Sequence, residues 1–256
     1  MASPMTFEQL VAEGESVPVE GWDFSWFEGR ASEERPTWRY SRMLAGRMAG
    51  ATRALDIQTG GGEVLAEIPE APAVLAATES WPPNLALARA NLAGLGATVA
   101  EVPDDADLPF ANDSFDLVVS RHPTVTRWDE IARVLQPGGN YVSQQVGAGS
   151  VRELTDFMMG AQPVNQTRDP ELAAVAAVAA GLEVFDLRQE ALPMAFHDVG
   201  AVVVFLRKVI WTVPGFTATG YRQQLARLHH QIQTHGPFVA HAQRFLIQAR
   251  KPHRST

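Results

Sequence analysis

The sequence of 256 residues contains no cysteine. Disulfides, thiolate metal sites and cysteine nucleophiles are therefore excluded. Basic residues are also fewer than acidic ones, 21 against 29, which gives a formal net charge of -8 at pH 7. This balance argues against a nucleic acid as partner, because binding to its backbone requires a basic face. We expect a small molecule as substrate, and the spacing of the histidines indicates no metal site.

Long hydrophobic runs are missing as well. The most apolar segments, near residues 172–182 and 199–206, are too short to cross a bilayer before charges interrupt them. The N-terminus is acidic and lacks the basic start and apolar block of a signal peptide. We therefore predict a cytoplasmic protein that does not use the membrane as a partner.

A glycine-rich turn is the most informative stretch that the chain does contain. Residues 54–57 predict a buried strand, glycines occupy 60–62, and residues 63–68 resume a helical pattern. Such a turn brings backbone N–H groups and a helix N-terminus close to a nucleotide-like ligand. Leu65 stands where the dinucleotide fingerprint requires its third glycine, which disfavours NAD and FAD. The carboxylate of Asp56 suits a sulfonium, so the stretch favours S-adenosylmethionine.

Three acidic residues follow consecutive predicted strands, at the edge where open α/β sheets bind ligands. Asp56 ends the first strand, Glu79 ends the second and Asp105 follows the third. Glu79 suits the two hydroxyls of a ribose. Asp105 can accept from an exocyclic amine, with Leu108 or Trp81 beside the base. Together with the glycine turn, these positions predict a ligand site.

Strands alternate with helices along the chain, which predicts an α/β fold with a mostly parallel, doubly wound sheet. Capping-box patterns start at Thr126 and Ser150, and Asp169 precedes a proline at another helix start. The expected strands cover residues 54–57, 73–78, 98–102, 115–120, 141–146, 183–189 and 241–249, and the later helices cover 198–211 and 218–234.

Four motifs in order, LDIQTGGGE, ATESWPPN, DDADLPFANDSFDLVVSRH and IARVLQPGGNYV, carry a family resemblance. As a set they resemble class I S-adenosylmethionine-dependent methyltransferases, and most closely the bacterial small-molecule group called methyltransferase type 11. The resemblance covers about residues 50–150. It implies a Rossmann-like, seven-stranded, mostly parallel sheet with helices on both faces and an antiparallel last strand. It implies an enzyme that uses S-adenosyl-L-methionine for O-, N- or C-methylation of a small-molecule acceptor.

The resemblance also implies where the cofactor binds. The glycines approach its methionine part, Glu79 holds the ribose, and Asp105 with Ala106 meets the adenine. Ser120 and Arg121 lie beside the transferable methyl. The predicted cofactor-binding residues are Asp56, Gln58, Gly60, Gly61, Gly62, Glu79, Ser80, Asp105, Ala106, Ser120 and Arg121.

Gln58 departs from the family pattern, which most often has glycine there. Its side chain could crowd the cofactor, or its amide could hydrogen-bond the methionine carboxylate. This residue keeps an alternative open: a methyltransferase-fold protein that binds the cofactor but acts as a binding module or a different catalyst.

A general base would assist some acceptors, and His122 is the candidate catalytic residue. Pro123 disfavours the helical region for the residue before it, so we expect His122 to be extended at the end of its strand. His197 or Asp198 could serve instead. Gln144 or Gln145 could orient the substrate.

We expect a single methyltransferase domain over residues 1–256. It would comprise an N-terminal helical lid at 1–50, a cofactor-binding core at 51–190, a helical insertion at 191–237, and the last strand and tail at 238–256. Phe24, Trp26 and Tyr40 of the lid would either cover a face of the sheet or close over the ligand.

Overall fold

The computed structural model describes residues 5–19 and 24–253. Residues 1–4 and 20–23 of the predicted lid and 254–256 of the predicted tail lie outside the described residues. The chain divides into two compact units. Unit 1 comprises Met1–Arg35, Gly149–Asn165 and Ala191–Gln243, and unit 2 comprises Pro36–Ala148, Gln166–Glu190 and Arg244–Thr256. Because every predicted cofactor-binding residue lies in unit 2, this unit positions the candidate site.

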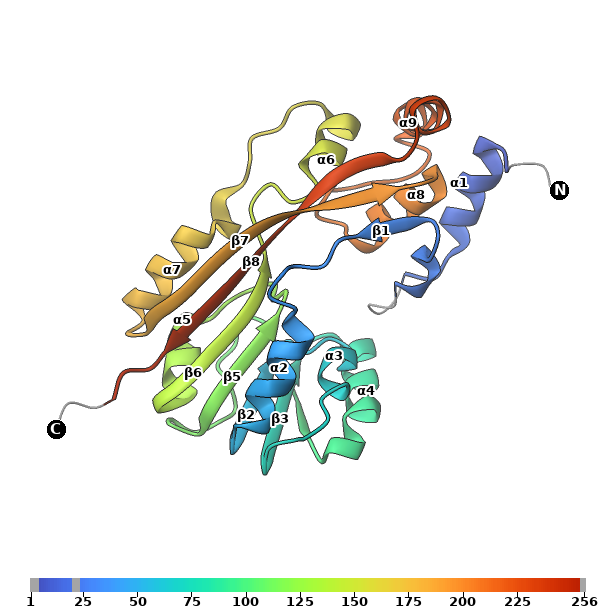
Figure 1. Cartoon of the computed structure of the whole chain (residues 1–256). Helices are drawn as coiled ribbons and strands as arrows, with labels where there is room; N and C mark the ends of the chain where they lie inside the picture. Colours follow the sequence, from blue (N-terminus) through green and yellow to red (C-terminus); the bar gives the residue numbers. More distant parts are fainter. Residues whose placement is uncertain (1–4, 20–23, 254–256) are drawn as a thin grey trace. The chain divides into compact units, whose positions relative to one another are not determined.

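The described residues form an eight-stranded sheet in the order β1-β7-β8-β6-β5-β2-β3-β4 (Figure 1). In unit 2, β2 pairs in parallel with β3 and β5, β3 with β4, and β5 with β6. The last strand, β8, is antiparallel to β6, with residues 244–250 opposite 140–146. The strands are β1 (Ala31–Glu33), β2 (Arg53–Ile57), β3 (Val74–Glu79), β4 (Thr98–Glu101), β5 (Phe115–Arg121), β6 (Leu135–Val146), β7 (Glu183–Phe196) and β8 (Phe238–Arg250).

The predicted Rossmann-like α/β fold with an antiparallel last strand is therefore confirmed. Seven of the strands, β2 to β8, are the expected ones. The eighth, β1, is a three-residue strand of unit 1 that pairs antiparallel with residues 194–196 of β7. No hydrophobic pattern in its sequence, Ala-Ser-Glu, indicates a strand.

Helices cover both faces of the sheet in unit 2, as predicted. On one face, α2, α3 and α4 bury Leu44, Leu65 and Ala88 against β2 and β3. On the other, α5 and α7 bury residues such as Ile131 and Ala177. These helices are α2 (Tyr40–Ala49), α3 (Glu63–Ala66), α4 (Pro82–Asn91), α5 (Trp128–Val134) and α7 (Pro170–Ala179), with short 3-10 turns η2 (Ala93–Leu95) and η3 (Gln166–Arg168).

Helix starts follow the sequence only in part. The Asp169 side chain caps α7 by accepting from two backbone N–H groups, as its position before Pro170 predicts. The capping boxes at Thr126 and Ser150 are wrong, because α5 begins after Arg127 and α6 (Arg152–Met159) after Val151, neither with a side-chain cap. Ser150 instead accepts from the N–H of Gln243.

Unit 1 packs its helices around α8 (Val199–Lys208), whose residues 199–206 are all buried. The other elements here are α1 (Phe7–Ser16), η1 (Ser25–Phe27), α6 and α9 (Arg222–His235). Both helices predicted at 198–211 and 218–234 are confirmed with shorter bounds. The strand predicted at 183–189 is longer than expected, since β7 continues to Phe196. Within residues 5–19 and 24–253, every helix falls short of the length and hydrophobicity that a bilayer span requires.

Candidate functional site

The glycine turn from β2 to α3 is tied to the end of β3. The N–H of Gly60 donates to Oε2 of Glu79 at 2.8 Å. Gly60 and Gly62 have φ of 68° and 77°, in the left-handed region that favours glycine. A Cβ on Gly62 would lie 2.9 Å from the Leu92 side chain, so α4 also packs closely against the turn. A Cβ on Gly61 would likewise overlap the Glu63 side chain, so two of the three glycines are sites of close approach.

Glu79 is the acidic residue that organises this side of the site. It is only 6% exposed, and its Oε1 accepts from the N–H groups of Ser80 at 3.1 Å and Trp81 at 2.9 Å. Burial raises the pKa of Glu79 above its ordinary value, and the N–H bonds from Trp81 and Gly60 oppose that shift. Three of the four or so acceptor positions of a carboxylate are thus filled, which leaves about one for a ligand hydroxyl.

Gln58 occupies the glycine position of the family pattern, and its backbone has φ of 56°. A non-glycine residue in this region costs about 1 kcal/mol or more. Its side-chain Oε1 accepts from the N–H of Thr124 at 2.6 Å, and its Nε2 donates to the carbonyl of Val125 at 2.7 Å. The Gln58 side chain therefore bridges the glycine turn to the loop after β5, a contact that we call the Gln58 strap.

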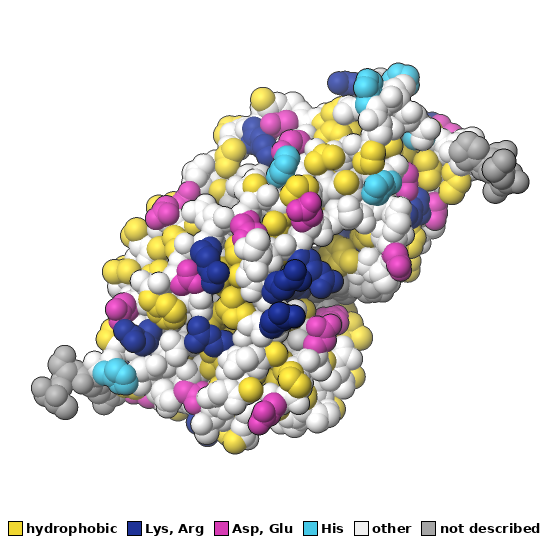
Figure 2. All heavy atoms as spheres, viewed as in Figure 1, with side chains coloured by type: hydrophobic (Ala, Val, Ile, Leu, Met, Phe, Trp, Pro, Cys, Tyr) yellow, Lys and Arg dark blue, Asp and Glu magenta, His cyan; other side chains and the backbone are white. Residues whose placement is uncertain are grey.

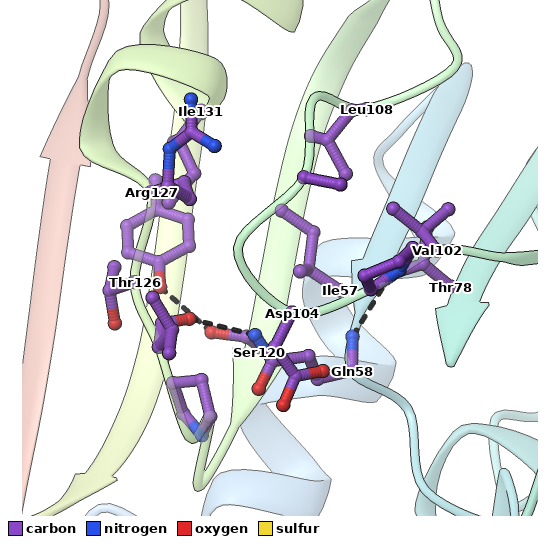
Figure 3. Close-up of a pocket in the computed structure, with 15 residues that line it drawn as sticks. Ile57, Gln58, Thr78, Val102, Asp104, Leu108, Ser120, Thr126, Arg127 and Ile131 are labelled. Carbon is purple, nitrogen blue, oxygen red and sulfur yellow. Dashed lines mark hydrogen bonds between the residues drawn. The ribbon is translucent and has the colours of Figure 1, made fainter. Parts of the chain in front are cut away.

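A cavity of about 20 Å³ lies beside the Gln58 strap. Apolar side chains of Ile57, Val102 and Leu108 line it together with polar side chains of Asp104 and Ser120 (Figure 3). This volume accommodates about one water molecule. The cavity alone is therefore much smaller than a nucleoside, and neither the glycines of the turn nor Glu79 line it. The complete lining is Ile57, Gln58, Thr78, Val102, Pro103, Asp104, Ala106, Leu108, Ser120, Pro123, Val125, Thr126, Arg127, Ile131 and Tyr141.

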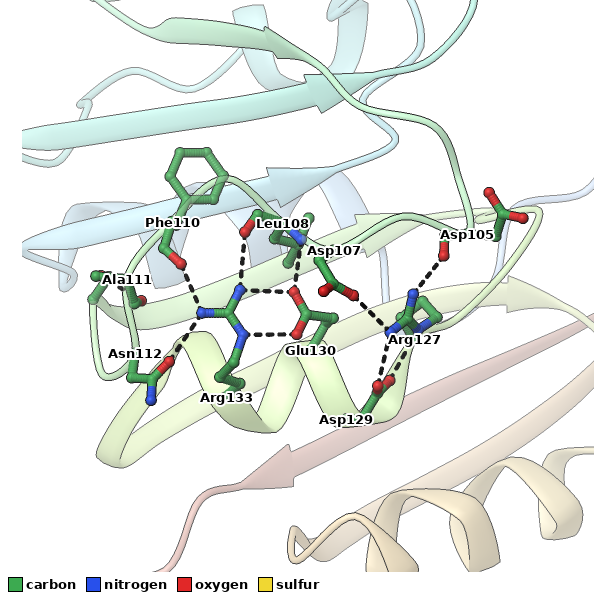
Figure 4. A network of polar contacts seen from close by, with 11 residues as sticks. Asp105, Asp107, Leu108, Phe110, Ala111, Asn112, Arg127, Asp129, Glu130 and Arg133 are labelled. Carbon is green, nitrogen blue, oxygen red and sulfur yellow. Dashed lines mark hydrogen bonds and ion pairs between the residues drawn. The ribbon is translucent and has the colours of Figure 1, made fainter.

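Three of the predicted cofactor residues line this cavity: Gln58, Ala106 and Ser120. Asp105 does not, because its side chain is exposed and points away from the neighbouring polar network (Figure 4). Asp104 lines the cavity instead, and its carboxylate accepts from the hydroxyl of Thr124. The sequence Asp104-Asp105 indicated an acidic residue after β4 but did not show which of the two faces the cavity.

Two arginines of the α5 region hold the loop that follows β4 (Figure 4). Arg127 donates to the carbonyl of Asp105 and forms ion pairs with Asp107 at 3.1 Å and Asp129 at 2.8 Å. These pairs raise the pKa of Arg127. Arg127 also lines the cavity. Its place in a capping-box pattern did not predict this position.

Arg133 is the second arginine of this network. It pairs with Glu130 at 2.6 Å and donates to the carbonyls of Leu108 at 2.9 Å and Phe110 at 2.7 Å. Buried Glu130 in turn accepts from the N–H of Leu108 at 2.6 Å. The hydrogen bond to Arg133 lowers the pKa of Glu130, so the carboxyl is ionised and anchors the loop.

Ser120 belongs to a buried hydroxyl network at the end of β5. Its Oγ lies 2.7 Å from the Tyr141 hydroxyl and 2.9 Å from Oγ of Ser143, and its carbonyl accepts from the Tyr40 hydroxyl at 3.0 Å. Burial raises the pKa of both tyrosines, so each is a neutral hydroxyl. Arg121, the next residue, is exposed at the end of the strand.

Asp56 is buried beneath the glycine turn and accepts from the Thr59 hydroxyl at 2.7 Å. Burial raises its pKa from an ordinary 3.8 to about 7, opposed by the Thr59 hydrogen bond and the charge of Arg121. Asp56 is not among the residues that line the cavity. Its contact with a cofactor stays a prediction.

His122 differs from expectation in its backbone. The extended conformation predicted before Pro123 is wrong, since φ is 54°. The N–H of His122 donates to the carbonyl of Gln144 at 2.7 Å, an inter-strand hydrogen bond that holds the reversal. Asp198, the alternative base, caps α8 and pairs with Arg30 at 2.8 Å in unit 1.

The residues of unit 2 fit a nucleoside cofactor chemically. The glycine turn offers backbone that side chains would obstruct, Glu79 retains an acceptor position, and Asp104 provides a carboxylate beside apolar Leu108. The carboxylates of Glu79 and Asp104 are hydrogen-bond acceptors, which suits them to ribose hydroxyls and an exocyclic amine.

The comparisons with known proteins agree with this chemistry. Residues 55–143 match the family model described as methyltransferase domain. No curated protein matches the chain.

Solved structures share the fold at low sequence identity. A putative methyltransferase from Bacillus halodurans is 18% identical with a TM-score of 0.60, over 84% of this chain and 99% of the other. An S-adenosylmethionine-dependent methyltransferase from Mesorhizobium loti is 17% identical with a TM-score of 0.50, over 83% and 96%. The [4+2]-cyclase SpnF is 18% identical with a TM-score of 0.51, over 86% and 85%.

These likenesses establish the fold, and the family match covers the strands that carry the glycine turn, Glu79 and Ser120. Residues 55–143 therefore match a methyltransferase domain, and S-adenosylmethionine is the cofactor that this match indicates.

Proposed function

We propose that this methyltransferase acts on a small-molecule acceptor by in-line methyl transfer. The observation that carries the proposal is the buried Glu79 carboxylate bonded to the glycine turn, which supports a ribose site at the end of β3. When bound, the cofactor supplies an electrophilic methyl on a sulfonium. The protein contributes position and orientation, which account for much of the acceleration in such reactions.

Each part of the cofactor has a proposed partner in unit 2. Gly60, Gly61 and Gly62 approach the methionine part, and Glu79 accepts from the ribose. Asp104 accepts from the adenine amine, a role that we now prefer to give to it rather than to Asp105, because Asp104 lines the cavity. The other predicted contacts, from Ser80, Ala106, Ser120 and Arg121, remain part of the proposal.

The small-molecule acceptor is supported by charge. The net charge is -8, and both acidic and basic side chains occur on the face that Figure 2 shows. A nucleic-acid substrate favours a continuous basic surface. Transfer of labelled methyl can be compared among a small-molecule extract, total RNA and protein. Label that enters only RNA or protein contradicts the proposal.

Titration calorimetry tests the cofactor site directly. We expect S-adenosylmethionine and S-adenosylhomocysteine to bind, and NAD to bind weakly or not at all. Tight NAD binding without any response to S-adenosylmethionine would overturn the assignment of the site.

A second candidate function is a cofactor-binding protein that transfers no methyl. The Gln58 strap favours it, because Gln58 lines a cavity of only about 20 Å³, and the fold of this chain is shared with a [4+2]-cyclase. The two candidate functions are distinguished by whether S-adenosylhomocysteine is formed. If the second holds, the protein binds S-adenosylmethionine yet releases no S-adenosylhomocysteine with any fraction of the extract.

A further inference from the structure

A chain of side-chain hydrogen bonds leads from buried Trp38 through Gln144 to half-buried His122. The indole N–H of Trp38 donates to Oε1 of Gln144 at 2.8 Å, and Nε2 of Gln144 lies 2.9 Å from Nε2 of His122. Trp38 is 7% exposed and Gln144 is 4% exposed. Gln144 sits in the middle of the sheet on β6, opposite Arg121 of β5 and Leu246 of β8. These contacts lie within unit 2 and leave the Gln144 amide engaged at both ends.

The chemistry of the indole fixes every proton in this chain. An indole N–H can only donate, so the group that faces Trp38 must be the amide oxygen of Gln144. The amide nitrogen of Gln144, which also can only donate, therefore faces His122. Nε2 of His122 must accept, so it carries no proton. A neutral imidazole then has its proton on Nδ1.

The backbone of His122 is held by the same residue. Its N–H donates to the carbonyl of Gln144 at 2.7 Å, while its φ of 54° places it in a region where non-glycine residues cost about 1 kcal/mol or more. Both the main chain and the ring are thus bonded to Gln144. A conformation that the chain would otherwise avoid is maintained by these two bonds.

Three arginines favour the neutral imidazole from three elements. Arg121 precedes His122 on β5, Arg244 lies opposite Val146 in β8, and Arg168 ends η3, where its carbonyl accepts from the N–H of Ala148 at 3.0 Å. Burial and the charges of Arg121, Arg244 and Arg168 lower the pKa of His122 well below 6.5. Protonation of Nε2 of His122 would also place its N–H against the amide nitrogen of Gln144, which is itself a donor. His122 is therefore neutral at neutral pH.

We propose that Gln144 is a positioning residue that holds His122 as its Nδ1–H tautomer, so that His122 offers the methyl acceptor a hydrogen-bond donor. This role rests on the proposed function, since it takes the acceptor to lie at the end of β5. His122 was predicted above as a general base, which accepts a proton; here it is instead a hydrogen-bond donor. Any proton on the attacking atom of the acceptor must then leave to another group or to water.

Nitrogen NMR of the full-length ¹⁵N-labelled protein tests the proposal without an acceptor. Long-range correlations from the two ring carbons distinguish Nδ1–H from Nε2–H, and the His122→Asn variant identifies the His122 signals. We expect a single neutral Nδ1–H pattern that does not change between about pH 6 and 8. A wild-type Nε2–H pattern, or a titration with a midpoint near about 6.5, overturns it.

Variants at Gln144 separate positioning from a merely structural role. In Gln144→Glu a carboxylate replaces the donor, so Nε2 of His122 gains a proton and the ring titrates at a higher pH. Gln144→Met removes the donor and allows both tautomers. Gln145→Met is the matched control on the same strand and should keep the wild-type pattern. If Gln144 variants do not fold, Trp38→Phe removes the anchor of the amide and should give a mixture of tautomers.

Cofactor binding is measured separately, by titrating S-adenosylhomocysteine into the same samples. Loss of binding with the Nδ1–H pattern intact contradicts the proposed function and leaves the tautomer assignment standing. Normal binding with an Nε2–H pattern contradicts only the inference. A Gln144→Glu protein that keeps the wild-type His122 pattern also refutes the positioning role.

Discussion

The glycine-turn side and the loop side of the candidate cofactor site in unit 2 differ in which groups hold them. On the turn side, backbone N–H groups of the glycine turn and of residues 80–81 converge on one carboxylate, Glu79. On the loop side, side chains join segments far apart in sequence: Gln58 with Thr124, and Arg133 with Phe110. A carboxylate that ends a strand beside a glycine turn can be recognised in the sequence, whereas the segment that an amide or guanidinium group reaches depends on the fold. The first side can therefore be predicted from a motif, and the second requires the structure.

The largest expected effect is on the turn side. Glu79→Ala should weaken S-adenosylmethionine binding by roughly 1–3 kcal/mol, because a charged acceptor for the ribose and the anchor of Gly60 are both lost. Calorimetry at constant salt measures it. Glu79→Gln, which keeps one acceptor, is the control and should lose less. Equal affinity of the alanine variant and the wild type would remove Glu79 from the site.

On the loop side, Arg133→Met should lower the free energy of unfolding by about 1–3 kcal/mol, because buried Glu130 loses its charged partner. Urea denaturation measures the loss. Arg127→Met is the matched control, and its loss should be smaller because its partners Asp107 and Asp129 are exposed to solvent. If the two variants lose the same stability, the Glu130 contact is not what anchors the loop.

Asp56 makes the turn side sensitive to pH. Its pKa is about 7 in the folded protein and 3.8 ordinarily, so the folded state prefers the protonated carboxyl. The stability contribution is complete below about pH 4 and is lost as pH rises through about 7. Asp56→Asn retains an acceptor for Thr59 and should raise the free energy of unfolding by about 1 kcal/mol or more at pH 8.

The check is thermal unfolding of Asp56→Asn and wild type at several pH values. The gain in melting temperature should grow from pH 5 to pH 8, and Asp116→Asn, a change to a half-buried carboxylate of β5 that accepts from the N–H groups of Thr52 and Arg53, should show no such growth. A gain that is constant with pH would mean that Asp56 has an ordinary pKa in the folded protein.

The smallest effect is expected at the Gln58 strap. Gln58→Gly removes both the amide bridge and the backbone strain, so S-adenosylhomocysteine should associate several-fold faster while its affinity stays within about tenfold or improves. Stopped-flow fluorescence measures association. Gln58→Ala keeps the strain but lacks the amide, and Thr124→Val removes one partner hydroxyl. Unchanged association in all three variants would show that the strap does not limit entry, whereas a large gain in affinity would favour the non-methylating candidate.

Much of the fold follows from the sequence because it rests on local patterns. The glycine turn, the parallel strands and the Asp169 cap each depend on a few neighbouring residues. The three-residue strand β1 and the extension of β7 to Phe196 do not, because they depend on pairing between residues more than 150 positions apart. Such pairing leaves no periodic signal in either segment.

The site divides in the same way. Glu79 stands at the end of its strand as its motif predicts. The choice between Asp104 and Asp105 depends on how the loop turns, and Arg127 reaches the loop from a different segment. The amide partners of Gln58 and Gln144 could not be predicted, since an amide gives no sequence signal of what it binds.

The place of β8 in unit 2 has a consequence for synthesis on the ribosome. β8 follows all the other strands in the chain, yet it lies between β6 and β7 in the sheet. Until β8 emerges from the ribosome, the edge of β6 that pairs with β8 is unpaired. β7 also lacks the strand that links it to β6. A nascent chain at this stage exposes a long strand edge, a surface that invites pairing with other chains. Translation pauses before residue 238 should therefore promote aggregation more than pauses at earlier helices.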